Sequence, residues 1–294
     1  HLPLTRAACA AGKHVVCDKL MALDLHEAEA MVAAASDAGR MLSVFHNRRW
    51  DGDYLAVRSV LGLEQADGSP VGAEGLSPFR ELAGSFGDLI RARAWVHSAG
   101  RPDPSRWRAR REKGGGIFSD WGAHLMDQAL ALHDSPAKWV WCRMLYAVPE
   151  VDVETSALCV IDFADGSSHV IETNQLYHEA AKGYELWGTD CRVVITGFDP
   201  RENLLNVAVR GVERRGPVYA IELHGEGLRS DRPAGGPQLV PPAGDWEAYY
   251  RNVAAHLLHG APLAVTAESV LRMMRLREAA LESAATGRTV TGPI

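Results

Sequence analysis

Residues 12–46 read GKHVVCDKLMALDLHEAEAMVAAASDAGRMLSVFH, and this pattern indicates the fold class. The apolar run at 14–18 suits a buried parallel strand, and a second such run occupies 41–45. Between them, Asp24 is a candidate helix N-cap with Glu27 as its capping-box partner, and apolar side chains recur at helical spacing as far as Gly39. Strand, helix and strand with tight links predict the C-terminal half of a Rossmann-type, doubly wound α/β domain.

The chain begins at His1 in a segment that reads as a helix already under way and ending at Gly12. A doubly wound sheet needs more than two strands, so we expect a further N-terminal part before His1. The sequence contains no G-x-G-x-x-G. Because a pyrophosphate needs such a loop and the helix that follows it, the chain as given is expected to bind a dinucleotide poorly.

The rest of the chain has a different pattern. Residues 90–97 alternate between apolar and polar side chains, which predicts a strand with one wetter face, and Asp165-Gly166 is a strong hairpin signal between two further strands. Residues 62–80 are interpreted as a surface insertion. We therefore predict two domains, a remnant of a dinucleotide-binding (Rossmann) domain at 1–46 and, at 47–294, an α+β substrate and oligomerisation domain with a mostly antiparallel open sheet. The remaining predicted strands are 139–147, 157–163, 169–174, 184–188, 192–196 and two near Asn206 and Tyr219, and the predicted helices are 53–61, 119–132, 246–258 and 266–285.

Composition narrows the class of protein. Of 294 residues, 47% are hydrophobic and 23% charged, which excludes a disordered chain, and no run of about 18 apolar residues suggests a membrane span. The formal charge of −6 disfavours a nucleic-acid or membrane partner. Five scattered cysteines do not make a disulfide framework and suit a reducing cytoplasm.

The sequence GGGIFSDWGAHLMD at 114–127 is the strongest chemical signal. On a helix, Asp120 and His124 share a face, with Asp127 nearby, and a carboxylate beside an imidazole fixes its tautomer for general acid–base work. A surface ion pair is the alternative for any Asp-x-x-x-His. A metal site is a further alternative, although no other His or Cys stands at ligand spacing.

Two other segments carry candidate residues. Lys19 follows the first strand, at the edge where ligands bind in α/β sheets, and could polarise a substrate oxygen; a solvated loop lysine is the alternative. Cys17 lies inside the strand and is interpreted as core. Trp107-Arg108 could stack on a ring or hold a phosphate, or could simply belong to a solvated basic loop.

These motifs together resemble the Gfo/Idh/MocA oxidoreductases. AGKHVVCDK at 11–19 resembles their A-G-K-H-V-x-x-E-K-P, and residues 114–127 are similar to their G-G-G-x-x-x-D-x-G-x-H-x-x-D signature. FHNRRW at 45–50 is similar to their strand-end segment, and Trp107-Arg108 to the W-R before the signature. Residues 184–189 and 283–288 resemble later landmarks, so the match runs in order along nearly the whole chain.

The resemblance implies NAD(P)-dependent oxidation or reduction of a sugar, inositol or related polyol. No metal is expected, because no further His or Cys stands at ligand spacing. It implies Lys19, Asp120 and His124 as catalytic residues, with Asp120 holding the tautomer of His124. It implies a cofactor site at Asp18, Lys19, Arg49, Trp107 and Arg108. Residues 47–54 and 197–202 look most like the scyllo-inositol dehydrogenase branch. A homo-oligomer formed through the open sheet is also expected.

The sequence departs from the family pattern at Asp18, where the family has Glu, and at Leu20, where it has Pro. Without the proline, the loop that presents Lys19 is expected to be less rigid. A non-catalytic sugar- or nucleotide-sensing relative and an inactive fragment therefore stay open as alternatives. NAD and NADP are not distinguished, because the residue that reads the ribose 2′ position is not in this sequence.

Overall fold

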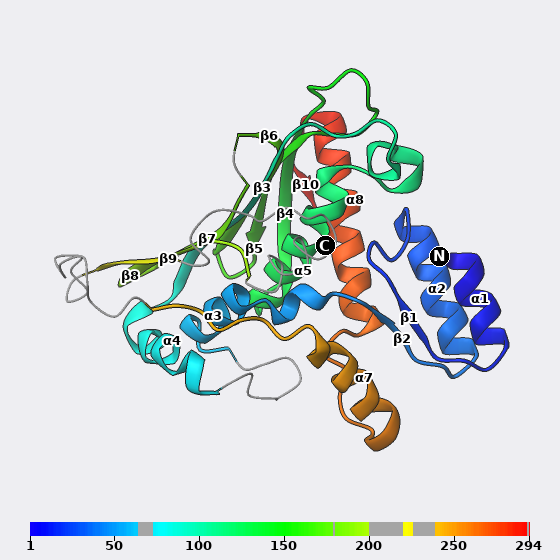
Figure 1. The fold of residues 1–294 in the computed structure, drawn as a ribbon, viewed down its shortest axis with the longest axis horizontal. Coiled ribbons are helices and arrows are strands. Elements are labelled where there is room, and N and C mark those ends of the chain that lie inside the picture. The colour runs from blue at the N-terminus through cyan, green and yellow to red at the C-terminus, as the bar shows by residue number, and fades with distance from the viewer. Residues whose placement is uncertain (64–72, 179, 200–219, 226–238, 293) are drawn as a thin grey trace.

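The computed structural model describes residues 1–63, 73–178, 180–199, 220–225, 239–292 and 294. It contains a two-stranded sheet near the N-terminus and a separate eight-stranded sheet. Figure 1 shows these two parts on either side of the long C-terminal helix. This is the predicted fold class, a Rossmann-type α/β unit followed by an α+β part. The domain boundary at 46/47 stays a prediction.

The N-terminal unit is a right-hand group of elements in Figure 1: α1 (Leu2–Ala10), β1 (Val15–Cys17), α2 (Leu25–Asp37) and β2 (Leu42–Val44). β1 and β2 pair in parallel, with Cys17 opposite Val44. The Asp24 carboxylate accepts a hydrogen bond from the backbone N–H of Glu27 at 2.8 Å, so the predicted cap begins α2. A capped helix linking two short parallel strands is the predicted strand–helix–strand pattern.

The large sheet has the strand order β10-β4-β5-β6-β3-β7-β8-β9. Among the described strands of this sheet, only β3 and β6 pair in parallel, and every other neighbouring pair is antiparallel. Gly166 has φ 89° in the β5–β6 turn, a conformation that favours glycine, as the hairpin signal predicted. The strands are β3 (Leu89–Ala99), β4 (Ala137–Leu145), β5 (Ser156–Phe163), β6 (Ser168–Tyr177), β7 (Ala181–Gly188), β8 (Cys191–Thr196), β9 (Ala220–Gly225) and β10 (Val290–Thr291).

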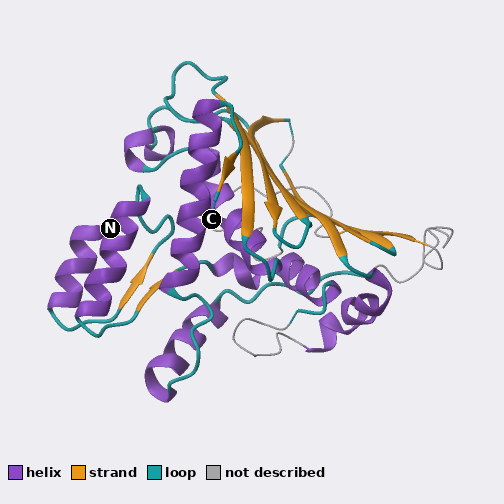
Figure 2. Cartoon of the chain, turned by 180° about the vertical axis from the view of Figure 1, so that it is seen from behind, coloured by secondary structure: helices purple, strands orange, loops and turns teal. Residues whose placement is uncertain are grey.

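Helices lie against the large sheet and join it to the N-terminal unit. The 20-residue α8 (Ala267–Thr286) contacts β4 of the large sheet as well as α2 and β2 (Figure 2). α5 (Ala123–Leu132) packs beside α8, and α3 (Gly52–Val60) and α4 (Ala73–Phe86) contact β7 and β8. α7 (Glu247–His259) projects away from the sheet. Because α8 contacts α2 and β2 as well as α5 and β4, it links the N-terminal unit to the large sheet.

The structure corrects two expectations from the sequence, and a third expectation concerns residues that the structure does not describe. Part of the expected surface insertion at 62–80 is the start of α4, whose Leu76 and Phe79 are buried in the core. The expected helix at 119–132 begins instead with a π-helical turn, Phe118–Gly122. The strand expected near Asn206 lies outside the described residues. Within the described ranges, none of the helices combines the length and apolar character that crossing a membrane requires.

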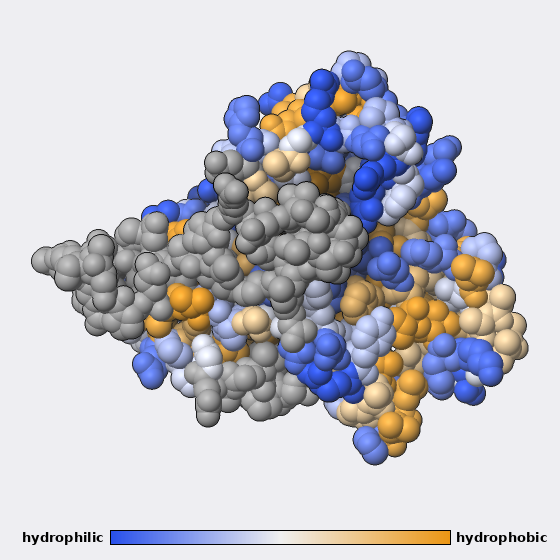
Figure 3. Space-filling view, viewed as in Figure 1, coloured by the Kyte–Doolittle hydropathy of each residue, from blue (hydrophilic) through white to orange (hydrophobic). Residues whose placement is uncertain are grey.

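Apolar side chains also reach the surface. Figure 3 shows orange, hydrophobic residues where Figure 1 places the N-terminal unit and α7. The exposed large apolar side chains of these segments are Leu4, Val16, Leu23, Tyr250, Leu257 and Leu258. Val16 lies in β1, opposite the buried Ser43 of β2, so an apolar side chain of the short parallel sheet is in contact with solvent.

Candidate active site

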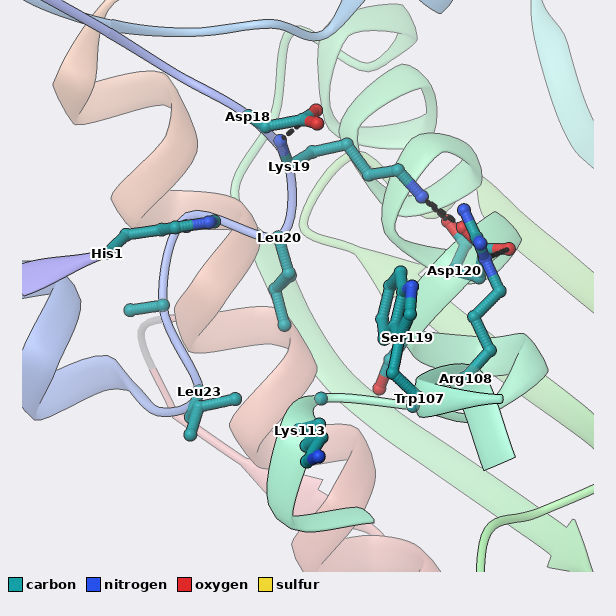
Figure 4. A pocket seen from close by; sticks show the side chains of 13 residues that line it. His1, Asp18, Lys19, Leu20, Leu23, Trp107, Arg108, Lys113, Ser119 and Asp120 are labelled. Atoms are coloured by element: carbon teal, nitrogen blue, oxygen red, sulfur yellow. Dashed lines mark hydrogen bonds and ion pairs between the residues drawn. The ribbon is translucent and has the colours of Figure 1, made fainter. Parts of the chain in front are cut away.

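A pocket of about 410 Å³ lies at the C-terminal end of β1 (Figure 4). On one side it is lined by the loop that follows β1, which carries Asp18, Lys19 and Leu20. On the other side it is lined by the segment 107–120, which carries Trp107, Arg108 and Asp120. The carboxyl ends of parallel strands are where ligands bind in α/β sheets, so the pocket is where the sequence predicted it.

Lys19 and Asp120 form the centre of this pocket. The Lys19 ammonium donates to the Asp120 carboxylate and also, at 2.8 Å, to the Asp120 backbone carbonyl. Arg108 Nε donates to the other carboxylate oxygen of Asp120 at 3.2 Å. Figure 4 shows the Lys19 and Arg108 side chains approaching Asp120 from two sides. Burial raises the pKa of Asp120, but the charges and hydrogen bonds of Lys19 and Arg108 outweigh it, so this pKa lies below its usual value.

The turn that carries Asp120 is held by Glu154. The buried Glu154 carboxylate accepts a hydrogen bond from the Phe118 backbone N–H at 2.8 Å. Gly116 has φ 104°, and a Cβ at this position would overlap that carboxylate. The third glycine of the motif is therefore required both for the backbone conformation and for the close approach of Glu154.

His124 lies at the start of α5 and is buried. Its Nδ1 has no hydrogen-bond partner among the described residues. Burial lowers the pKa of His124 well below its ordinary value, and the positive charges of Lys19 and Arg48 lower it further. The imidazole is therefore neutral near pH 7, the state in which it can accept a proton.

The structure does not join Asp120 to His124. Among the described residues, the hydrogen bonds of the Asp120 carboxylate go to Lys19 and Arg108. The expectation that Asp120 holds the tautomer of His124 was wrong for this geometry. It assumed α-helical i,i+4 spacing, whereas Asp120 lies in the π-helical turn, where a wider turn moves position i+4 out of line.

Arg49 is placed away from the pocket. Its guanidinium binds both oxygens of Asp127, at 2.8 and 2.6 Å, and also donates to the Ala264 carbonyl. Arg49 and Asp127 are both buried. The geometry therefore favours a role in holding η1 (Asn47–Trp50) against α5 over the expected contact with a cofactor.

Trp107 and Arg108 both line the pocket, as the sequence predicted for a ring- or phosphate-binding segment. The Arg108 guanidinium lies 4.5 Å from the centre of the Trp107 ring, which is half-exposed. Asp18 lines the pocket too, and its carboxylate accepts a hydrogen bond from the Lys19 backbone N–H at 2.8 Å. The Lys19–Leu20 peptide bond is cis.

Sequence reasoning missed two groups near His124. His46 directly follows β2, and its ring centre lies 5.8 Å from that of His124. Lys182 from β7 is buried against Asp51 and Asp53 at 2.6 and 2.9 Å. The position of His46 at a strand end was the available signal. The Lys182 cluster joins residues about 130 positions apart, and no local pattern indicates such a pairing. Within the described ranges, no group of His, Cys, Asp and Glu side chains is arranged to hold a metal ion.

Two family models match the chain. Residues 1–46 match the oxidoreductase family model with an NAD-binding Rossmann fold, and residues 82–194 match the GFO/IDH/MocA C-terminal domain. The first match covers the N-terminal unit that supplies Asp18 and Lys19. The second covers the segment 107–127 and most strands of the large sheet.

Individual proteins are similar over nearly the whole chain. The uncharacterized oxidoreductase YdgJ of Escherichia coli is 30% identical over 290 residues, which cover 97% of this chain and 75% of that protein. The scyllo-inositol 2-dehydrogenase (NADP(+)) IolW of Bacillus subtilis is 27% identical, covering 99% of this chain and 75% of that protein. Among solved structures, yvaA of Bacillus subtilis has a TM-score of 0.80 and 26% identity, with 99% of this chain and 77% of that one covered.

Proposed function

Because this chain belongs to the Gfo/Idh/MocA family of oxidoreductases, we propose that it passes a hydride between NAD(P) and a secondary alcohol of a sugar, inositol or related polyol. The observation that carries this proposal is the meeting of Lys19 and Asp120 in one pocket, with the buried His124 at the start of the helix that directly follows the turn of Asp120. A fixed cation and a neutral base are the two groups that alcohol oxidation requires.

The residues of the pocket fit the nicotinamide half of such a cofactor. The half-exposed Trp107 ring offers a plane for stacking, and Arg108 and Lys19 offer hydrogen-bond donors at a strand end. We assign Asp18, Lys19, Trp107 and Arg108 to the cofactor site. When bound, the cofactor supplies the acceptor or donor of the hydride.

The chain's own residues position the substrate and move its proton. Asp120 holds the Lys19 ammonium in place, so that Lys19 can orient and polarise the substrate oxygen. His124 takes the hydroxyl proton during oxidation and returns it during reduction. Its lowered pKa keeps the imidazole unprotonated beforehand. The ion pair with Asp120 for Lys19 and the helix α5 for His124 hold both groups, so that the reacting atoms can meet in near-attack geometry.

An inositol ring is the substrate we favour, because the relative IolW is named a scyllo-inositol 2-dehydrogenase and the wording of residues 47–54 resembles that branch. A polyol and sugar panel with NAD and NADP on the full-length protein tests the choice of substrate and cofactor. We also propose a cytoplasmic homo-oligomer that associates through the open face of the large sheet.

Replacing His124 by Ala tests the proposed chemistry. Loss of a general base should lower kcat roughly 10²–10⁴-fold on the best substrate of the panel. Cofactor affinity should change little, because Lys19, Trp107 and Arg108 remain. His133→Ala is the matched control, since His133 is also buried with a lowered pKa but hydrogen-bonds Ser167 at the far end of α5. Wild-type turnover in His124→Ala would refute the acid–base role of His124. A wild-type protein that binds a panel compound but turns none over would favour a non-catalytic, ligand-sensing relative.

A further inference from the structure

His46 is a buried imidazole whose hydrogen-bonding capacity is not used. Its side chain is fully buried, and neither ring nitrogen has a hydrogen-bond partner among the described residues. The nearest carboxylate oxygen, Oδ2 of Asp127, lies 3.7 Å from Nδ1, which is too long for a hydrogen bond. An unpaired buried polar group costs free energy, so its presence needs an explanation.

The partner that His46 faces is His124. The two ring centres are 5.8 Å apart and the ring planes meet at 87°, an edge-to-face arrangement. The Nδ1 atom of His124 is buried, and it too has no hydrogen-bond partner in the described part of the chain. Two neighbouring imidazoles thus leave three buried nitrogens unpaired.

This contact bears on the tautomer that the proposed reaction needs. If His124 accepts the substrate proton at Nε2, the hydrogen of the neutral ring must sit on Nδ1. Among the described residues Nδ1 of His124 has no hydrogen-bond partner, and the two nearby carboxylates of the sequence motif are engaged elsewhere, Asp120 with Lys19 and Asp127 with Arg49. His46 is therefore the polar group available to the buried edge of the ring. Catalytic hydrogen bonds are often long without ligands and tighten when charge develops.

The other charged groups around the pair oppose a positive His124. Charges that act on His124 come from four elements and lower its pKa: Lys19 after β1, His46 after β2, Arg48 in η1 and Lys182 in β7. Burial lowers the pKa of His46 to about 4, against the attraction of Asp127 and with further lowering by Arg49 and Lys19, while Asp18 raises it slightly. His46 is thus uncharged at neutral pH and can accept from, or donate to, its neighbour.

We propose that His46 is a positioning residue for the reaction, which fixes the ring orientation and the Nδ1–H tautomer of His124, the role that the sequence assigned to Asp120. This inference rests on the proposed function of His124 as the acid–base group. His46 acts through His124 and does not itself contact substrate or cofactor.

The test compares His46→Leu, which removes the polar atoms, with His46→Asn, which keeps a donor and an acceptor close to the backbone, where ring Nδ1 lies. We expect His46→Leu to lower kcat at least about tenfold, because a wrong tautomer withholds the base, while KM stays within about threefold. The acid limb of the kcat–pH profile should move to higher pH, because His46, once protonated at low pH, opposes a second positive charge on His124. His46→Asn should recover most of kcat.

A second readout does not depend on activity. Nitrogen-15 spectra of labelled histidines report the tautomer of each ring, and His46→Leu should shift the His124 signals away from the Nδ1–H form. His169→Leu is the matched control: His169 is equally buried, and its Nε2 is also unpaired among the described residues, but it lies in β6 beside His133. It should lower stability without moving the His124 signals.

The outcomes are distinguishable. Unchanged kcat, acid limb and His124 signals in His46→Leu would overturn the role of His46 while the effect of His124→Ala still stands. If His124→Ala keeps wild-type turnover, the proposed acid–base role of His124 fails instead, and the His46 role in catalysis falls with it. In that case a changed His124 spectrum in His46→Leu would identify a purely structural contact.

Discussion

Lys19 and Asp120, 101 positions apart in the sequence, form an ion pair across the candidate active site. Lys19 lies in the loop that follows the parallel strand β1, and Asp120 lies in the π-helical turn that precedes α5. The pair therefore joins the element that would meet the cofactor to the element that carries His124. It also explains why Asp120 is not available to His124.

Asp120→Asn should weaken the hold on Lys19 and leave the tautomer of His124 unchanged. We expect kcat to fall by roughly 10- to 100-fold, because a mobile Lys19 orients the substrate oxygen poorly. Steady-state kinetics and histidine nitrogen-15 spectra measure the two effects separately. Asp152→Asn, which removes a contact to Arg111 on the same loop region, is the control and should leave kcat near wild type. A shifted His124 tautomer in Asp120→Asn would restore the direct pairing that the sequence predicted.

Arg49→Ala should lower the free energy of unfolding by about 3–5 kcal/mol, because it leaves the Asp127 carboxylate buried without its partner. Urea denaturation measures this loss. Arg101→Ala breaks an ion pair with Glu150 in which both side chains are more than half exposed, so it should cost less than about 1 kcal/mol. An Arg49 variant that keeps its stability but loses cofactor affinity would return Arg49 to the cofactor site.

Lowering the pH below 6.5 should destabilise the protein even before the pH reaches the range in which carboxylates titrate. Burial lowers the pKa of His46 and of His133 to about 4, compared with an ordinary value of 6.5. Between pH 6.5 and 4 the unfolded chain binds protons that the folded chain does not, so stability falls as pH falls. The slope is about 1.4 kcal/mol per pH unit for each such histidine.

Urea denaturation at pH 7, 6 and 5 checks this slope. His133→Gln should reduce the slope by about 1.4 kcal/mol per pH unit, because the unfolded variant no longer binds a proton at this position. A free energy of unfolding that is flat from pH 7 to 5 would contradict the lowered pKa values.

Gly116→Ala should be much more harmful than a comparable change at another glycine with positive φ. At Gly116, with φ 104°, the new Cβ would overlap the Glu154 carboxylate, so the turn before Asp120 must move. Gly166 has φ 89°, but no atom lies within 4 Å of the position that a Cβ would take there. Gly166→Ala therefore shows the cost of backbone conformation alone, about 1–2 kcal/mol. Thermal melts and kcat together measure the difference, and equal losses in the two variants would show that Glu154 yields easily.

Leu158→Glu should dissociate the proposed oligomer. Leu158 lies in β5 on the wetter face of the sheet, opposite Arg143 of β4 and Glu172 of β6, and is partly exposed. A charge there would oppose burial against a second copy. Sedimentation or light scattering gives the mass. Leu258→Glu on the projecting α7 is the control and should leave the mass unchanged. A wild-type protein that sediments as a monomer would refute the oligomer.

The sequence by itself determined the elements and their class. Alternation of Ala92, Ala94 and Val96 with polar neighbours specified β3, the Asp24 cap specified the start of α2, and Asp165-Gly166 specified the β5–β6 turn. These features depend on residues within a few positions of one another, and hydrophobic period and capping are local properties of the chain. The motifs likewise identified Lys19, Asp120 and His124 as candidate site residues.

The partners of the charged groups were decided only by the tertiary structure. Asp120 stands four positions from His124 but pairs with Lys19 and Arg108. Arg49 forms a buried ion pair with Asp127. The position of His46 against His124 likewise requires η1, which begins directly after His46, to pack against α5. A carboxylate takes whichever cation the packed backbone brings within reach, and several cations and imidazoles compete for each one. That competition is settled by three-dimensional distance and burial, which spacing along the chain does not specify.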